Sequence, residues 1–251
     1  ATVYRDEKSG QLAGLTRVRS ITQDDGHLFC RTSQIGEEVS VITSIIKEFY
    51  TTFGMIDGYW VRLSVRGKDG KYLGSNDIWT AAENALEMSA KENALPYTRI
   101  EGEAAFYGPK LDFMFKDALD REWQLATIQC DFNLPERFDL SFVNEKGEKE
   151  RPVVIHRAIS GSLERFIGIM IEHCAGAFPL WISPVQVAIL PIGEAHRAYA
   201  EELANTLRNE NFRVEILSDE SLGKRIRETK VKKIPYTFVV GDQEIESKTV
   251  S

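Results

Sequence analysis

Residues 110–130 read KLDFMFKDALDREWQLATIQC and contain two strand-like runs, Lys110–Phe115 and Trp123–Cys130, with a turn between them. Short, largely apolar runs bounded by turns are typical of antiparallel strands. Similar runs occur on either side, at Ala104–Tyr107, Phe138–Phe142 and Val153–His156. This part of the chain therefore predicts an antiparallel sheet.

The residues around this sheet predict further strands and long helices. Strands are expected at Val3–Arg5, Leu15–Ile21 and Tyr59–Val65, and helices at Glu37–Phe53, Asp77–Glu92 and Ile159–Ala175. The first of these helices carries Val39, Ile42 and Ile46 at helical spacing. The second follows a polar start at Ser75, which is typical of a helix N-terminus.

The pattern changes near Phe178–Trp181, where Pro179 indicates a boundary between domain 1–180 and domain 181–251. Beyond it, strands and helices alternate at Val185–Leu190, Ala195–Asn209, Arg213–Leu217, Leu222–Val231 and Tyr236–Val240, and Thr249–Ser251 lies in a last strand. Such alternation predicts a small α/β domain with a partly parallel sheet. The whole chain is thus expected to combine α+β and α/β architecture.

Composition and charge limit the possible classes of protein. The chain has 251 residues, of which 43% are hydrophobic and 27% charged, as in an ordinary soluble globular protein. No run approaches the roughly 18 apolar residues of a membrane helix, so no membrane partner is expected. The net charge of −7 argues weakly against a nucleic-acid coat protein but leaves room for a local basic patch. Three widely spaced cysteines predict no disulfide framework and fit a reducing cytoplasm.

Arginines close to carboxylates are the first candidates for chemistry. Arg5 and Glu7 are two residues apart, so on a strand they would project from the same face. A guanidinium can bind phosphate oxygens with two hydrogen bonds, and a carboxylate can accept from an exocyclic amine. Arg17 lies on the next expected strand, and Arg165 lies in an apolar helix where it needs a partner. Ordinary surface ion pairs would explain the same spacings.

His27, His156 and a basic segment complete the candidates. Two histidines with a cysteine could hold zinc and leave a position open for substrate, although isolated histidines are more often structural. Six cations crowd a short segment near the C-terminus: Lys224, Arg225, Arg227, Lys230, Lys232 and Lys233. This segment suits a phosphate backbone or, equally, a solvated helix face. Neither GxxxxGK[ST] nor GxGxxG occurs, so ATP would have to bind without a glycine cradle.

Taken in order, these segments resemble the threonyl-tRNA synthetase family of class II aminoacyl-tRNA synthetases. Tyr4–Glu7, Gly14–Arg19 and Gln23–Cys30 resemble motif 2 and the segment directly after it, His156–Ile159 with Gly161–Phe166 resembles motif 3, Phe106–Lys110 and Thr127–Phe132 match further signatures, and Val185–Val250 resembles the class IIa anticodon-binding domain. The ordered set covers nearly the whole chain and is highly specific.

The resemblance implies a fold and a reaction. The fold would be an antiparallel sheet of six or seven strands with flanking helices, followed by a small α/β anticodon-binding domain. The reaction would be that of an ATP-dependent threonine–tRNA ligase: threonine and ATP give threonyl-adenylate, and the threonyl group passes to tRNA(Thr). A homodimer in the cytoplasm and Mg²⁺ with the ATP are also implied.

The resemblance assigns roles residue by residue. Arg5 and Arg165 would be catalytic, and the ATP site would comprise Arg5, Glu7, Arg17, Gln124, Gln129, Ser162 and Arg165. Threonine would be held by Gln23, Asp25, Tyr107 and Lys110. His27 and His156 would bind Zn²⁺, through which the enzyme distinguishes threonine from valine, and Arg227 and Glu244 would read the tRNA anticodon. Asp219 stands where the family often has asparagine, and aspartate can only accept hydrogen bonds, which affects base recognition there.

Some parts of the family pattern are absent from the chain. They are the third zinc ligand, a cysteine upstream of motif 2, motif 1 with its dimer interface, the editing domain, and the end of the anticodon-binding domain. The chain is therefore expected to be a fragment, which could be inactive, or a sequence that omits residues of a longer polypeptide.

Three alternatives stay open. A serine, proline or histidine synthetase would lack the zinc pattern of Asp25 with His27 and His156. A non-catalytic tRNA-binding fragment or paralogue would bind tRNA without forming adenylate, although the intact arginines argue against decay of the ATP site. A structural protein with accidental similarity has little support because too many motifs occur in order.

Overall fold

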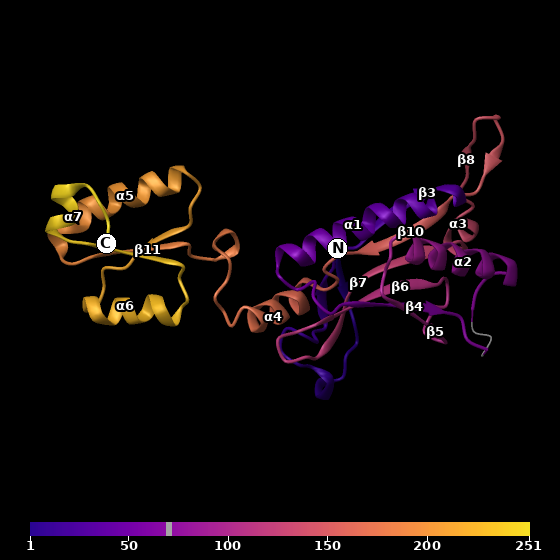
Figure 1. The fold of residues 1–251 in the computed structure, drawn as a ribbon, viewed down its shortest axis with the longest axis horizontal. Coiled ribbons are helices and arrows are strands. Elements are labelled where there is room, and N and C mark those ends of the chain that lie inside the picture. The colour runs from indigo at the N-terminus through magenta and orange to yellow at the C-terminus, as the bar shows by residue number, and fades with distance from the viewer. Residues whose placement is uncertain (69–71) are drawn as a thin grey trace. The chain divides into compact units, whose positions relative to one another are not determined.

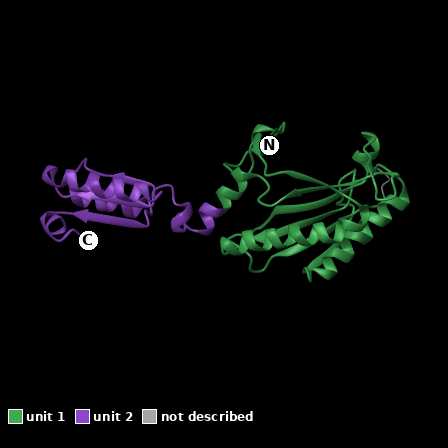
Figure 2. Ribbon diagram, turned by 90° about the horizontal axis from the view of Figure 1, so that it is seen from above, with its two compact units in different colours: residues 1–169 green, residues 170–251 purple. Residues whose placement is uncertain are grey.

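The computed structural model describes residues 1–68 and 72–251. Contacts divide the chain into two compact units, residues 1–169 and 170–251 (Figure 2). This division falls inside helix α4 (Leu163–His173), whereas the sequence predicts a boundary after residue 180, in the short helix η3 (Leu180–Ile182). Within the described residues, no helix is long and apolar enough to cross a membrane.

A six-stranded sheet forms the centre of the first unit (Figure 1). Its order is β3 (Gly26–Cys30), β10 (Val153–Ala158), β7 (Glu122–Asp131), β6 (Lys110–Lys116), β4 (Trp60–Val65) and β5 (Tyr97–Glu101). All neighbours pair antiparallel except β4 and β5, which are parallel. The predicted antiparallel sheet is thus confirmed except at this edge, because a helix connects β4 to β5 and returns the chain in the same direction.

The two faces of the sheet differ in chemistry. Leu63, Phe113, Ile128 and Ile155 are fully buried on one face. Helices α1 (Ile35–Thr52) and α2 (Asn76–Glu92) pack against this side of the sheet and against each other (Figure 1). Both helices were predicted from the sequence, and the Ser75 hydroxyl accepts a hydrogen bond from the Ile78 amide as an N-cap of α2.

A ring of aromatic contacts joins α1 to the sheet and to α4. Tyr50 of α1 is fully buried and stacks on Phe115, with 3.6 Å between ring centroids. Its hydroxyl donates to the Ile159 carbonyl at 2.9 Å, just before α4. The rings of Phe49 and Phe166 are tilted against each other nearby, with centroids 5.2 Å apart. This ring holds the start of α4 close to the sheet.

The N-terminal hairpin is shorter than predicted. β1 (Thr2–Tyr4) pairs with β2 (Ser20–Thr22) in a separate two-stranded sheet, with the short helix η1 (Ser9–Gln11) between them. Of the predicted strand Leu15–Ile21, only Ser20 and Ile21 belong to β2, because Leu15 and Thr16 continue a turn that begins at Gly14, where φ is +48°. A positive φ reverses the chain locally and prevents an extended strand from forming there.

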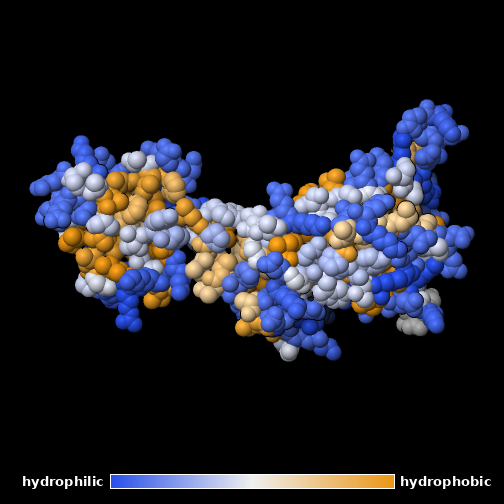
Figure 3. Space-filling view, viewed as in Figure 1, coloured by the Kyte–Doolittle hydropathy of each residue, from blue (hydrophilic) through white to orange (hydrophobic). Residues whose placement is uncertain are grey.

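Two other strand predictions are wrong, and β5 was not predicted. Ala104–Tyr107 forms a turn with only an isolated bridge between Ala105 and Gly108. Phe138–Phe142 is not a strand either. It follows helix α3 (Asn133–Arg137), and only its last residue lies in a strand, β8 (Phe142–Val143), which forms a small hairpin with β9 (Lys149–Glu150). Asp139 has φ +49°, which breaks any extended run. The hairpin lies at the side of the first unit and is hydrophilic (Figures 1 and 3).

Helix α4 begins at Leu163 rather than at the predicted Ile159. Gly161 has φ +69°, and a Cβ at this position would lie 2.4 Å from the Leu125 carbonyl oxygen. The loop 159–161 therefore cannot continue the helix toward its N-terminus.

The second unit is a three-stranded sheet with helices between its strands. Its order is β12 (Val214–Ile216), β11 (Val187–Pro191) and β13 (Tyr236–Val240), with η4 (Glu194–His196), α5 (Arg197–Asn209), α6 (Leu222–Val231) and α7 (Asp242–Ser247). Both strand pairs are parallel, so the predicted partly parallel sheet is fully parallel. Helix α7 was not predicted. Ser251 exchanges backbone hydrogen bonds with Val239, but no final strand forms.

None of the three cysteines is in a disulfide. Cys30 and Cys130 are buried, and burial raises the pKa of the Cys30 thiol to about 11. The sequence prediction of no disulfide framework is confirmed, and these buried thiols behave as small apolar side chains. A short helix, η2 (Thr32–Gln34), separates Cys30 from α1.

The Tyr50 hydroxyl allows a direct test of the packing. Tyr50→Phe leaves the Ile159 carbonyl without its donor inside the core, so the free energy of unfolding should fall by roughly 1–3 kcal/mol. Urea unfolding would measure this. Tyr236→Phe, at a residue that is 53% exposed, is the control and should change little. Equal stability of the two variants would contradict the prediction.

Acid stability should depend on Asp117. Burial alone would raise the pKa of this carboxyl, but hydrogen bonds from Trp123 and Arg121 outweigh it and lower the pKa to about 2. Because this pKa is lower in the folded than in the unfolded state, the ionised Asp117 stabilises the fold above about pH 4. This stabilisation is lost as the pH falls to about 2. Asp117→Asn should therefore show a smaller loss of stability over this pH range in urea titrations. If the variant loses as much stability on acidification as the parent, Asp117 does not have this role.

Candidate active site

The face of the sheet opposite α1 and α2 carries polar side chains in cross-strand rows. Lys110, Gln129, His156 and His27 are direct neighbours across β6, β7, β10 and β3. Since side chains alternate between the faces of a strand, residues paired in register lie side by side on one face. Residues from four strands therefore form one continuous polar surface.

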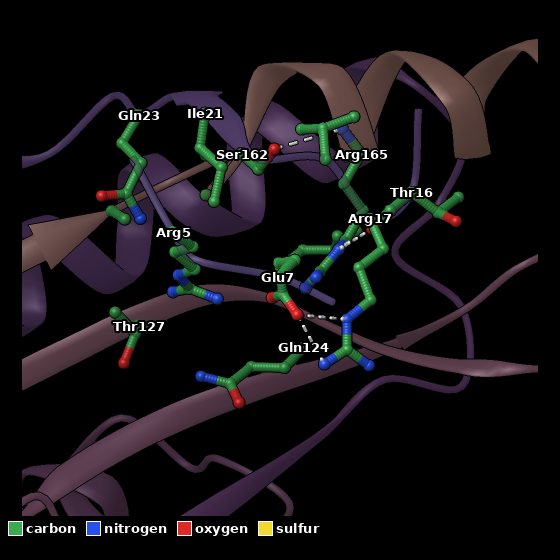
Figure 4. Close-up of a pocket in the computed structure, with 14 residues that line it drawn as sticks. Arg5, Glu7, Thr16, Arg17, Ile21, Gln23, Gln124, Thr127, Ser162 and Arg165 are labelled. Carbon is green, nitrogen blue, oxygen red and sulfur yellow. Dashed lines mark hydrogen bonds and ion pairs between the residues drawn. The ribbon is translucent and has the colours of Figure 1, made fainter. Parts of the chain in front are cut away.

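An open cleft with a volume of about 210 Å³ lies beside this surface (Figure 4). Its walls include seven residues that the sequence assigned to the site: Arg5, Glu7, Arg17, Gln23, Gln124, Ser162 and Arg165. They come from the N-terminal hairpin, from β7 and from the start of α4.

The hairpin arranges its charges differently from the prediction. β1 ends at Tyr4, so Arg5 and Glu7 do not share a strand face, although both line the cleft. Glu7 pairs with Arg17 instead: the Nε and Nη2 of Arg17 donate to Glu7 Oε2 at 3.1 and 3.0 Å. Arg19 donates to the Glu7 backbone carbonyl at 2.9 Å. Arg5 is exposed, and among the described residues its guanidinium has no hydrogen-bond partner.

Positive charge is in excess in this cleft. Burial lowers the pKa of Arg165, and the nearby Arg5 and Arg17 lower it further. The Arg165 Nε donates to the Thr16 carbonyl at 3.0 Å, and its guanidinium lies 6.0 Å from the Trp123 ring centroid. Because one carboxylate, Glu7, faces three guanidinium groups, the cleft suits a ligand with several negative charges.

Two carboxylates that sequence reasoning missed connect the start of α4 to the N-terminal segment. Asp24 belongs to that segment, and Glu164 belongs to α4. Asp24 accepts hydrogen bonds from the amides of Ile159, Ser160 and Gly161 at 2.9, 3.0 and 3.0 Å. Both carboxylate oxygens of Glu164 accept from the Thr22 amide at 3.0 Å. No sequence signal distinguishes Asp24 from its neighbours, since its role depends on a loop that is distant in the chain.

A second group surrounds the histidines. The rings of His27 and His156 are 4.7 Å apart, and Tyr107 lies 5.7 Å from His156. The Tyr107 hydroxyl donates to Gln129 Oε1 at 3.0 Å, so Gln129 belongs to this group and not to the arginine cleft. Burial raises the pKa of Tyr107, and the nearby Asp131 and Asp25 raise it further. Tyr107 therefore stays protonated and can donate or accept a hydrogen bond.

His156 has a buried carboxylate behind it. Its Nε2 lies 2.9 Å from Asp131 Oδ2, and Asp131 is fully buried. The other Asp131 oxygen accepts from the Asn133 and Leu134 amides. A carboxylate on one ring nitrogen orients a histidine so that its other nitrogen can bind a metal. Among the described residues, however, no group of three histidine, cysteine or acidic side chains could hold a metal ion.

The residues expected to read an anticodon lie in the second unit. Arg227 is on the exposed side of α6, and Glu244 is in α7. Both Glu244 oxygens are engaged, by the Ser251 hydroxyl at 2.7 Å and the Gly241 amide at 2.8 Å. The first of these bonds is the main cause that lowers the pKa of Glu244.

The basic segment of the second unit is partly neutralised. Lys224 pairs with Glu220, and Lys232 pairs with Glu228. Arg225 is buried and donates to the carbonyls of Pro191 and Leu217, both at 2.7 Å. The exposed cations left for a partner are Arg227, Lys230 and Lys233.

Two family descriptions match the chain. Residues 1–174 match the tRNA synthetase class II core domain (G, H, P, S and T). Residues 186–251 match the anticodon-binding domain. The first match includes the whole first compact unit, and the second covers most of the second unit.

Curated relatives share about half of the residues. A threonine–tRNA ligase of Deinococcus deserti is 51% identical over 254 residues, covering 100% of this chain and 39% of the relative. That of Thermus thermophilus is 50% identical over 252 residues, covering 100% of this chain and 38% of the relative. The chain thus spans about two fifths of the length of these relatives.

Solved structures have the same fold. A structure of the RNA-binding domain of threonyl-tRNA synthetase from Cryptosporidium parvum superposes with a TM-score of 0.93 at 39% identity, covering 100% of this chain and 62% of that one. A prolyl-tRNA synthetase of Giardia lamblia, solved with prolyl-adenylate, superposes with a TM-score of 0.70 at 18% identity over 98% of this chain and 46% of that one. At that identity, the second likeness concerns the fold alone.

The arginine cleft should bind a multivalent anion whatever its chemical origin. Pyrophosphate should raise the midpoint of thermal unfolding, because a ligand at about 100 times its Kd stabilises the folded state by about 2.7 kcal/mol. Arg165→Gln should remove most of this shift. Arg151→Gln, at an exposed arginine near β9, should keep it. Sodium chloride at equal ionic strength controls for screening, and an equal shift in both variants would refute the site.

Proposed function

The chain belongs to the family of class II tRNA synthetase core domains, and we propose that it is the part of a threonine–tRNA ligase that activates threonine with ATP. In the first step a carboxylate oxygen of threonine attacks the α-phosphorus, the bond to the β-phosphate breaks, and pyrophosphate leaves. In the second step a terminal ribose hydroxyl of tRNA(Thr) attacks the threonyl carbonyl, and AMP leaves.

One observation supports this proposal above the others. A cleft with three arginines and one carboxylate lies next to a cluster of His27, His156, Tyr107 and Asp25 on the same sheet face. The first suits a triphosphate, and the second suits a small polar amino acid. Side by side, they suit a reaction between the two substrates.

The arginines would act on the phosphates. Arg5, whose guanidinium has no hydrogen-bond partner in the described part of the chain, would bind the α-phosphate and the threonine carboxylate, where negative charge grows as the new bond forms. Arg17 and Arg165 would bind the outer phosphates, with Mg²⁺ entering together with the ATP. Glu7 would accept from the adenine amine, and Gln124 and Ser162 would contact the nucleotide.

The histidine cluster would hold the threonine. Gln23, Asp25, Tyr107, Lys110 and Gln129 would surround the amino acid, with Asp25 accepting from its hydroxyl. A site built to bind a hydroxyl rejects valine far more strongly than an apolar pocket could. Serine retains the hydroxyl, so some serine should be activated, and an editing step would be needed.

His27 and His156 fit as two ligands of zinc. They are adjacent cross-strand neighbours, and Asp131 orients the ring of His156. A catalytic zinc site uses three protein ligands, of which the described residues supply two. When bound, zinc would supply a Lewis acid for the amino and hydroxyl groups of threonine.

The second unit would read tRNA(Thr). Arg227 and Glu244 would contact anticodon bases, Glu244 after releasing the Ser251 hydroxyl. Lys230 and Lys233 would bind the phosphate backbone. The whole protein would act as a homodimer in the cytoplasm.

Amino-acid-dependent exchange of pyrophosphate into ATP is the test. Threonine should support exchange, serine should support less, and valine and proline should support none. Arg5→Ala should lower the threonine rate by about 100-fold or more, because it removes a group that acts on the transition state. Arg151→Gln is the matched control. Near-normal exchange by Arg5→Ala would exclude its role, and tRNA binding without any exchange would favour a non-catalytic tRNA-binding protein.

Metal content tests the zinc assignment without relying on activity. His156→Ala should lose most of its zinc, because loss of a direct ligand weakens binding strongly, and should discriminate less between threonine and valine. His196→Ala, at a histidine of the second unit that pairs with Asp242, is the control and should keep its zinc. Equal zinc in both variants would rule out His156 as a ligand.

A further inference from the structure

The polar sheet face contains one fully buried carboxylate with no assigned role. Asp112 lies on β6, two residues beyond Lys110, and is 0% exposed. It is the cross-strand neighbour of Arg62 on β4 and of Thr127 on β7. It therefore lies in the row next to the one that contains Lys110, Gln129 and the histidines.

Side chains from three strands converge on this carboxylate. Asp112 Oδ2 accepts from Lys110 Nζ at 2.7 Å, from Arg62 Nη2 at 3.1 Å and from the Ser64 hydroxyl at 3.1 Å. Asp112 Oδ1 accepts from Gln124 Nε2 at 2.7 Å and from the Thr127 hydroxyl at 2.9 Å. One oxygen thus holds the two cations, and the other holds residues that line the arginine cleft.

Arg62 completes the fixation of Gln124. Its Nη2 donates to Gln124 Oε1 at 3.0 Å, while Gln124 Nε2 donates to Asp112. The amide group is held at both ends, so its orientation is set by these two partners. One N–H and one lone pair of the amide remain for a ligand in the cleft.

A purely structural carboxylate in this chain looks different. Asp117, at the end of β6, accepts from the amides of Leu119 and Arg121 and so fixes its own turn. Asp112, among the described residues, accepts hydrogen bonds from side chains only, and all of them lie on the polar sheet face. Its bonds thus position functional side chains and hold no backbone turn.

We propose that Asp112 and Arg62 are positioning residues that link the threonine subsite to the nucleotide subsite. The proposal rests on the proposed function, in which Lys110 contacts threonine and Gln124 contacts ATP. Both side chains are anchored to one carboxylate, which sets their separation and hence the alignment of the two substrates. Such alignment matters because a misplacement of about 1 Å can cost about 100-fold in rate.

The test is a set of single and double variants in the protein that carries this chain, assayed by threonine-dependent ATP–pyrophosphate exchange. Asp112→Asn keeps the size of the side chain but loses its charge and should raise the KM for both threonine and ATP by about tenfold. In a Lys110→Met background the same substitution should have little further effect on the threonine KM. In a Gln124→Met background it should have little further effect on the ATP KM.

Asp117→Asn is the matched control. It also removes a buried carboxylate next to β6, so it should lower stability but leave both KM values near those of the parent. If Asp112→Asn behaves like Asp117→Asn, or if its effects add fully in both double variants, the positioning role is overturned. Absence of exchange in the unsubstituted protein would instead refute the proposed function.

Arg62→Gln keeps the test decisive if Asp112→Asn does not fold. The Arg62 side chain is 21% exposed, so its loss is tolerated more easily than loss of a fully buried group. This variant should raise the ATP KM, through Gln124, more than the threonine KM. Equal changes in both KM values, or none, would exclude the link.

Discussion

The structure depends on a single constraint: one sheet must bury one face completely and keep the other polar. Phe113 and Ile128 have no exposed surface because α1 and α2 cover them. Asp112 and Gln129, on the alternate positions of the same strands, face the opposite way. Strand alternation thus lets one short stretch supply both the core and the site, and a shift of one residue in register would exchange the two.

The rest of the site is brought to this polar face from distant parts of the chain. The N-terminal hairpin contributes Arg5, Glu7 and Arg17, and the start of α4 contributes Ser162 and Arg165. Asp24 and Glu164 connect these two segments through backbone amides. Because each carboxylate accepts more than one hydrogen bond, the connection is specific in geometry as well as favourable in energy.

The site concentrates charge that does not stabilise the fold. Three arginines share a cleft with one carboxylate, and the proximity of Arg5 and Arg17 adds to burial in lowering the pKa of Arg165. A buried carboxylate at Asp112 holds two more cations. The repulsion among the three arginines is tolerated where a ligand relieves it. The aromatic packing around Tyr50 and Phe115 supplies rigidity to this part of the unit.

The sequence by itself determined the strands and helices with a clear period, among them α1, α2, β6, β7 and α6, and the ordered motifs named seven of the residues that line the cleft. It did not reveal β5, the turn at Ala104–Tyr107, or the start of α4 at Leu163. β5 depends on a helical crossover, and the start of α4 depends on left-handed backbone at Gly161 and on the Asp24 carboxylate. Only the tertiary structure decided that Glu7 pairs with Arg17, that Gln129 joins Tyr107, and that Asp112 connects Lys110 to Gln124. Local sequence encodes periodicity and turn preference, whereas the partner of a charged side chain is chosen by residues that are distant in sequence and adjacent only after folding.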